Sequence, residues 1–183
     1  MFCREISDYC STKNSIKLLL LNKYNFNKNS IGEIDASYTI SIYNLKIIQL
    51  KKLYCISKNI NHMINLTELH LGKKQDNINK LTKLKKLNCD NNEGIKNLNH
   101  LTHLKYLSCK SKSEVNQKGI KQLINIKKLC FDYNQKIDNV NHIVNLKELS
   151  CVNSAIDQKS IEKICKLRKL NCSVNDTINN LIT

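Results

Sequence analysis

The chain has 183 residues, a formal net charge of +15 and 41% apolar residues. This length predicts one domain that can bury a core. Four glycines and no proline exclude collagen-like and proline-rich disordered chains. The longest apolar run, Leu18–Leu21, is far too short to span a bilayer.

The cysteines and the N-terminus predict a cellular compartment. The residues Met1–Glu5 do not begin the charged and then apolar stretch of a secretory signal. Nine cysteines without such a signal indicate reduced thiols. We therefore expect an intracellular protein of the cytoplasm or nucleus, neither secreted nor bound to a membrane.

The positive charge favours acidic partners. Thirty Lys and Arg stand against fifteen Asp and Glu, which suits nucleic acid, an anionic surface or an acidic protein. The codons of Lys, Asn and Ile are rich in A and T, however. A biased base composition explains much of the charge equally well.

The segment 1–44 is predicted to contain two short helices, at 5–10 and 14–24. Its sequence resembles the later two thirds of an F-box, without the usual opening Leu-Pro. That resemblance implies docking to the Skp1 subunit of a cullin ubiquitin ligase. The alternative is a helical cap that shields the first repeat. Residues 25–44 could also hold a degenerate repeat.

The segment 45–183 contains seven copies of one pattern. In each copy two leucines or isoleucines stand three apart, and a cysteine or another apolar residue follows two positions later. The second leucine and the cysteine share one face of a strand, because side chains alternate along a strand. The copies begin at Leu50, Leu66, Leu84, Leu104, Ile126, Leu146 and Leu167.

This pattern resembles the leucine-rich repeat family in its short form of about 20–22 residues. The resemblance implies an α/β solenoid, an arc with a curved parallel sheet and one short strand per repeat. Turns or short helices would form the convex side, with a small helical cap at the N-terminus. The composition and the repeated sequence L-K-x-L-x-C are also similar to those of repeat proteins of giant DNA viruses of amoebae. This resemblance implies a host or viral partner.

The family pattern places an asparagine three residues after the cysteine position, where its amide bonds the backbone of neighbouring turns. Asn92, Asn134 and Asn175 fit this pattern. Lysine cannot accept a hydrogen bond. We therefore expect a broken asparagine ladder in the first, second and fourth copies, which have Lys58, Lys74 and Lys112.

The repeated cysteines are predicted to be buried, because Leu71 and Phe131 replace them in two copies. These cysteines are Cys55, Cys89, Cys109, Cys151 and Cys172. Zinc sites prefer a C-x-x-C spacing, and the sequence contains none. Cys130 stands at an outward strand position and is expected to be exposed. The recurring His62, His100 and His142 alternate with Lys and Gln in other copies, which indicates solvated convex positions.

Motifs of catalysis are missing from the sequence: it has no glycine-rich phosphate loop, no H-E-x-x-H and no G-x-S-x-G. A stacked solenoid presents an open surface, whereas catalysis needs groups that converge in a pocket. We therefore expect a non-enzymatic protein without cofactor or metal.

The concave face is the predicted binding surface. Outward strand positions and the positions two residues further on line it, and aromatic residues are the usual anchors of interfaces. The candidate partner-binding residues are Tyr54, His70, Asn88, Tyr106, Ser108, Lys110, Cys130, Asp132 and Tyr133.

A basic stripe is predicted beside this face, because ten of the fourteen residues that follow the first leucines are Lys or Arg. Lys85, Lys86, Lys127 and Lys128 are its candidate contacts. The main hypothesis is a module that binds a polar or acidic protein on the concave face. The alternatives are a substrate receptor of a cullin ligase, nucleic-acid binding through the stripe, or a merely solvated edge.

Overall fold

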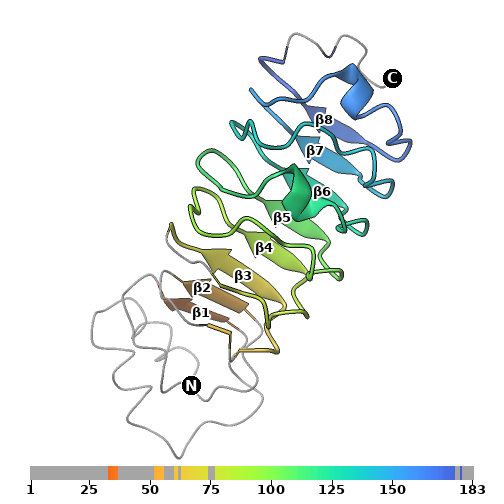
Figure 1. The fold of residues 1–183 in the computed structure, drawn as a ribbon. Coiled ribbons are helices and arrows are strands. Elements are labelled where there is room, and N and C mark those ends of the chain that lie inside the picture. The colour runs from red at the N-terminus through yellow and green to blue at the C-terminus, as the bar shows by residue number, and fades with distance from the viewer. Residues whose placement is uncertain are drawn as a thin grey trace, which may run out of the picture.

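A computed structural model describes residues 33–36, 52–55, 60–61, 63–73, 77–175 and 178. These residues form one sheet of eight short parallel strands in chain order (Figure 1). The fold is therefore the predicted parallel solenoid with one strand per repeat. The strands are β1 (Glu33–Ala36), β2 (Lys52–Cys55), β3 (Glu68–Leu71), β4 (Lys86–Asn88), β5 (Tyr106–Ser108), β6 (Lys128–Cys130), β7 (Glu148–Ser150) and β8 (Lys169–Asn171).

The register of the sheet follows the sequence pattern. The second leucine of each copy pairs with the second leucine of the next, as Leu87 does with Leu107 and Leu107 with Leu129. Leu87, Leu107 and Leu129 are fully buried. The residues on either side of them in β4, β5 and β6 face away from the core. The spacing in the sequence thus fixes both the strand and its inward face.

The first strand lies in the segment 25–44. Ile34 pairs with Leu53 and Ala36 with Cys55, in the same parallel register as the later copies. The sheet therefore extends into this segment, as a degenerate repeat requires. The helices predicted at 5–10 and 14–24, and with them the F-box-like phrase, lie outside the described residues.

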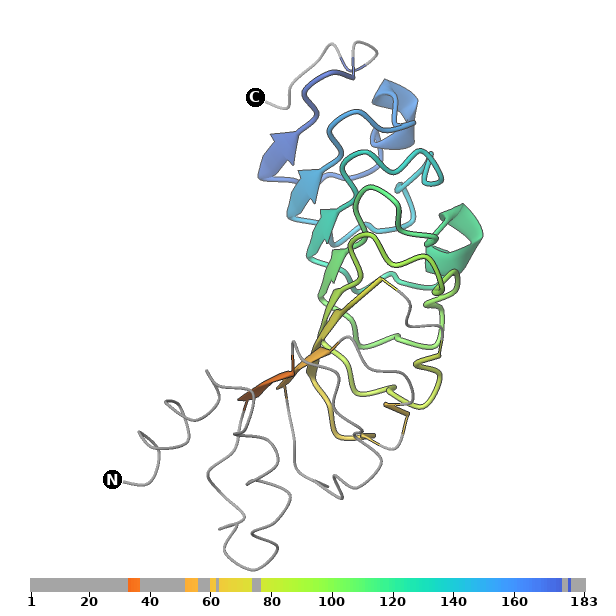
Figure 2. The same ribbon diagram turned by 90° about the vertical axis from the view of Figure 1, so that its left-hand side faces the viewer.

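Tight turns close each repeat behind the sheet. Apolar residues three apart form successive turns, in which the N–H of Leu101 donates to the carbonyl of Leu98 and that of Leu104 to Leu101, each at 2.9 Å. Two short 3-10 helices, η2 (Gln117–Ile120) and η3 (Gln158–Ser160), lie on the side opposite the strands (Figure 2). These turns and short helices match the predicted convex side. No described helix is long and apolar enough to cross a membrane.

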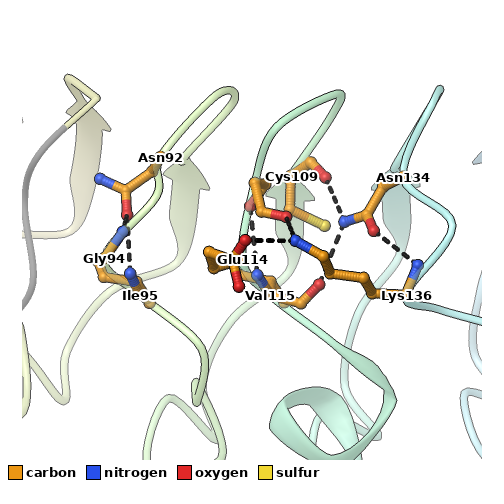
Figure 3. Close-up of polar contacts among 9 residues, drawn as sticks. Asn92, Gly94, Ile95, Cys109, Glu114, Val115, Asn134 and Lys136 are labelled. Atoms are coloured by element: carbon orange, nitrogen blue, oxygen red, sulfur yellow. Dashed lines mark hydrogen bonds and ion pairs between the residues drawn. The ribbon is translucent and has the colours of Figure 1, made fainter.

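The predicted asparagine ladder is confirmed at Asn92, Asn134 and Asn175. Figure 3 shows Asn92 and Asn134. The amide of Asn134 donates to the carbonyls of Cys109 at 2.9 Å and Val115 at 3.1 Å, and its oxygen accepts from the N–H of Lys136 at 2.9 Å. Asn134 is buried. One side chain therefore satisfies backbone groups in two turns.

In the fourth copy the ladder position is held by Ser113 and not by the predicted Lys112. Lys112 is exposed, and the next residue, Ser113, is fully buried in its place. The N–H of Ser113 donates to the carbonyl of Lys110, as that of Asn92 donates to Cys89. One extra residue shifts the position along the chain, so counting three residues from the cysteine selected the wrong side chain.

The repeated cysteines are confirmed as core residues where their side chains are described. Cys89, Cys109 and Cys151 are fully buried, and Cys172 is half-buried against the same core. Burial raises the pKa of both Cys89 and Cys151 to about 12, against the opposing hydrogen bonds of Ser113 and Ser154 respectively. These thiols are therefore neutral packing groups at neutral pH.

The expectation of solvated histidines is wrong for His100 and His142. Both are half-buried, and the Nε2 atom of each lies against a carbonyl of the preceding repeat, at 3.2 Å from Ile78 and 3.0 Å from Ile120. Burial lowers the pKa of His100, although the Ile78 carbonyl opposes the shift. Each ring thus joins two turns, a role that the exchange with Lys and Gln did not reveal.

Candidate functional site

The concave face of the sheet carries a polar network that begins at Asp90. One oxygen of its carboxylate accepts from the hydroxyl of Ser108 at 2.7 Å and from the N–H of Lys110 at 2.8 Å. Both donors belong to the next repeat. Ser108, a predicted contact, is 1% exposed and therefore fully engaged in the fold.

The same arrangement recurs two repeats later at Asp132. Its Oδ1 accepts from the hydroxyl of Ser150 at 2.6 Å and from the N–H of Val152 at 3.0 Å, and its Oδ2 pairs with the Lys110 ammonium at 2.7 Å. Burial would raise the pKa of Asp132, but the Lys110 ammonium, the Ser150 hydroxyl and the Val152 N–H together lower it. Asp90 and Asp132, with their donors, form what we term the concave network.

The concave network contradicts the predicted exposure of Cys130. This residue does occupy the outward strand position, yet it is only 7% exposed. Lys110, Asp132 and Lys128 surround its thiol closely enough to act on its charge, and burial raises its pKa. An outward strand position is therefore not an exposed one here, because charged side chains of the same and the preceding repeat surround the small thiol. The exposed cysteine of the described repeats is Cys165.

A pocket of about 420 Å³ opens on the strand side around Tyr106. Tyr106 is half-buried, and burial raises the pKa of its hydroxyl. The pocket brings together five residues of the predicted site with one that was not predicted, Glu68. The lining residues are Glu68, His70, Lys86, Asn88, Tyr106 and Lys128.

The strand residue that precedes each inward leucine forms a vertical row, which we term the inner column. In this row positive and negative side chains pair: Lys86 lies 3.5 Å from Glu68, and Lys128 lies 2.9 Å from Glu148. The Glu148 carboxylate also lies 3.9 Å from Lys169. The hydrogen bond from Lys128 lowers the pKa of Glu148. From β3 to β8 the column is Glu68, Lys86, Tyr106, Lys128, Glu148 and Lys169.

One residue earlier in each repeat lies a second row, the outer column. Each N–H in it donates to the carbonyl of the equivalent residue in the preceding repeat, always at 2.8 Å, so the residues stack in register. No ion pair joins these side chains to a carboxylate anywhere in the described repeats. The outer column consists of Lys85, Lys105, Lys127, Lys147 and Arg168.

The outer column borders an open groove of about 570 Å³, which we term the rim groove. Five of its nine lining residues are cationic and none is acidic. Lys166 donates to the side chain of Asn145 at 2.8 Å, and Asn125 donates to the carbonyl of Thr102 at 3.0 Å. The lining residues are Lys105, Asn125, Lys127, Asn145, Lys147, Cys165, Lys166, Leu167 and Arg168.

The structure separates the predicted contacts into distinct groups. Lys85 and Lys127 belong to the unpaired outer column, whereas Lys86 and Lys128 belong to the paired inner column. Tyr133 is 58% exposed and occupies the turn after β6, with a left-handed φ of 60°, so it does not line the Tyr106 pocket. The side chain of Tyr54 lies outside the described part of the chain.

The prediction of a basic stripe did not name Lys105, Lys147 or the groove residues Asn125, Asn145 and Cys165 as contacts. The signal was present, because a cation follows the first leucine in five consecutive copies from Leu84 onward. Treating two adjacent cations as one stripe obscured it. Within the described repeats, no group of three or more His, Cys, Asp or Glu could hold a metal ion.

No family model matches the sequence, and no curated protein matches it. Among solved structures, the functional domain of InlJ from Listeria monocytogenes, described as including a cysteine ladder, matches with a TM-score of 0.62 and 18% identity. The match covers 77% of this chain and 34% of that one, so this chain spans about a third of the InlJ domain. Internalin C2 from the same organism matches with a TM-score of 0.51 and 21% identity, over 69% and 73% of the two chains.

These similarities concern the fold, because the identities are low. The stacked short parallel strands of the described repeats agree with this likeness of fold. In this chain, Cys89 and Cys109 occupy one buried position in adjacent repeats. The described repeats form a parallel solenoid of the leucine-rich-repeat type.

Proposed function

We propose that this chain is a non-enzymatic protein-interaction module that receives a polar or acidic protein on its concave face. The observation that carries this proposal is the pocket of about 420 Å³ around Tyr106. A half-buried tyrosine offers a rigid ring to a partner and keeps a hydroxyl for a hydrogen bond, which is typical of interface anchors. The pocket lies on an open sheet face that a folded partner can reach.

The concave network supports this proposal as a rigid platform. The Asp90 carboxylate fixes the Lys110 backbone N–H, and the Asp132 carboxylate fixes the Lys110 ammonium. The Lys110 side chain therefore has little rotational freedom left to lose on binding, which lowers the entropic cost of association. Tyr106 and the ion-paired Lys86 and Lys128 are the groups presented to a partner.

The setting proposed for this module is the interior of a cell. The buried thiols Cys89, Cys109, Cys130 and Cys151 are free rather than bridged, which suits a reducing compartment. The resemblance to giant-virus repeat proteins extends the proposal to a host or viral partner.

Photocrosslinking of the full chain tests the proposed face. A photoreactive amino acid at Asn88 lies in the pocket, whereas one at the exposed Lys118, in η2 on the side opposite the strands, is the matched control. We expect a partner to crosslink from Asn88 only. The partner is then produced recombinantly, and its affinity is measured for Tyr106→Ala and Tyr106→Phe.

The expected loss for Tyr106→Ala is about tenfold or more in Kd, with Tyr106→Phe close to the wild type if ring packing dominates. Urea unfolding of both variants separates lost contact from lost folding. Equal crosslinking from both positions, or full affinity in a folded Tyr106→Ala variant, would refute the proposed face.

A further inference from the structure

The outer column concentrates unpaired positive charge in one row. Its five residues directly precede successive parallel strands, which are spaced by about 4.8 Å, so the column is about 19 Å long from Lys85 to Arg168. Lys85, Lys105, Lys127 and Arg168 are exposed and Lys147 is half-buried. The inner column beside it contains carboxylates, but they pair with inner-column lysines.

The surroundings of the rim groove favour a protein over a nucleic acid. No aromatic side chain lines the groove, although unpaired bases are held chiefly by stacking on such rings. Ile124 and Val144 directly precede the groove residues Asn125 and Asn145, and they are 54% and 50% exposed. A phosphate backbone gains nothing from these aliphatic groups, whereas a protein can bury them.

The spacing of the column favours a helical ligand. Residues three and four apart on an α-helix are neighbours on one face, 4.5 and 6 Å apart along the axis at a rise of about 1.5 Å per residue. The mean of the two helical spacings, about 5.3 Å, exceeds the strand spacing of about 4.8 Å by only about 0.5 Å per step. Same-face residues of an extended strand are about 6.6 Å apart and exceed it by about 1.8 Å per step, so their mismatch with the column grows more than three times as fast.

We propose that the outer column binds an acidic α-helix of a partner protein, with its carboxylates on the column and aliphatic side chains over Ile124 and Val144. A column of about 19 Å matches about 13 helical residues. This inference rests on the proposed function only in taking a protein as partner, because the surface is separate from the Tyr106 pocket.

Two synthetic peptides test the inference on the full chain. The first is a fluorescein-labelled 15-residue helix with four glutamates on one face, and the second is an isomer of the same composition with the glutamates distributed around the helix. Fluorescence anisotropy at low salt measures both affinities. We expect the one-face peptide to bind at least fivefold more tightly than its isomer and to lose affinity as salt rises.

Two triple variants give a control that is matched in charge. The outer triple, Lys105→Gln, Lys127→Gln and Lys147→Gln, and the inner triple, Lys86→Gln, Lys128→Gln and Lys169→Gln, each remove three positive charges. We expect the outer triple to weaken peptide binding tenfold or more and the inner triple less than twofold. Circular dichroism confirms that both variants are folded.

Several outcomes would overturn the inference. Equal losses in the two triples would mean that net charge alone attracts the peptide, and equal affinity of the isomers would remove the helical match. A 12-base-pair DNA duplex that binds more tightly than the peptide, and loses affinity in the outer triple, would assign the column to nucleic acid. Failure of the proposed function at Tyr106 can be distinguished from failure of this inference, because Tyr106→Ala should leave the affinity for the peptide unchanged.

Discussion

The concave network and the rim groove lie on neighbouring surfaces of the same repeats, yet they differ in how much of their polarity is already used. In the concave network each carboxylate is bonded across the repeat boundary, as Asp132 is by Ser150 and Lys110. At the rim, Lys105, Lys127 and Lys147 have no carboxylate partner in the described repeats. Formal charge therefore gives little indication of the charge that a partner can meet.

Register explains this difference. In the inner column, strand pairing places Lys86 beside Glu68 and Lys128 beside Glu148, so the opposite charges neutralise each other. The outer column places like charges on adjacent strands, where two charges about 5 Å apart repel by roughly 0.8 kcal/mol in water before salt screening. Substitutions in the network should consequently change stability, and substitutions at the rim should change binding.

The largest expected contrast is in thiol reactivity. Cys165 lines the rim groove and is exposed, whereas Cys109 is fully buried, so its reaction requires local opening of the fold. We expect a maleimide to modify Cys165 about 100-fold faster than Cys109 or more, with Cys130 on the slow side. Mass spectrometry of timed samples gives the rate at each site. Comparable rates at Cys130 and Cys165 would show that the concave face is open.

Removal of a side-chain amide of the asparagine ladder should give the largest loss of stability. Asn134→Ala leaves the carbonyls of Cys109 and Val115 without their donor, at a cost of about 2–3 kcal/mol. Asn125→Ala at the rim removes one exposed hydrogen bond and should cost less than about 0.5 kcal/mol. Urea denaturation measures both. Similar losses would mean that the asparagine ladder is no stronger than a surface contact.

The stability of the fold should depend on pH through Asp132, a carboxylate of the concave network. The pKa of Asp132 is lowered in the folded state, so its contribution to stability is present above its unfolded pKa of about 3.9 and is lost as pH falls through the folded value. Asp132→Asn should cost about 1–2 kcal/mol at neutral pH and reduce the decline in stability below about pH 4. Urea unfolding midpoints of the wild type and of Asp132→Asn are measured across this pH range. The assignment would be contradicted if the stability of both proteins fell in parallel.

A smaller effect is expected in the turns that follow the strands. Tyr133 has a left-handed backbone, as do Asn91 and Asn153 at the equivalent positions, and asparagine tolerates this conformation better than tyrosine. Tyr133→Asn should therefore stabilise the fold by about 0.5 kcal/mol, and the reciprocal Asn153→Tyr should destabilise it by a similar amount. Thermal unfolding measures both. A loss of stability in Tyr133→Asn would show that the ring packs on the fold.

The sequence was sufficient to predict the solenoid, because each repeat carries its own inward positions, such as Leu107 and Cys109. The resemblance to the leucine-rich repeat pattern predicted the hydrogen bonds of Asn134, because that pattern places an asparagine at this position after the strand. The sequence could not predict the burial of Ser113, since one extra residue displaced the repeat count. Exact counting from a fixed position fails wherever a turn changes its length.

The candidate site was harder to predict for two physical reasons. Alternation along a strand gives the direction of a side chain but not its exposure, so it predicts an exposed thiol at the outward Cys130, which is only 7% exposed. Pairing depends on residues of adjacent repeats: Lys127 and Lys128 look alike in the sequence, and only Lys128 lies beside Glu148. Contacts between repeats, rather than the pattern within one, determine the available surface.

The most direct test of the contrast between the two columns is the salt dependence of unfolding in the outer and inner triple variants. Both lose three positive charges, so a general charge effect changes them equally. At low salt we expect the outer triple to be more stable than the wild type and the inner triple less stable, by a few tenths of a kcal/mol in each direction. Both differences should shrink in high salt. A shift of the same sign in both variants would contradict the account.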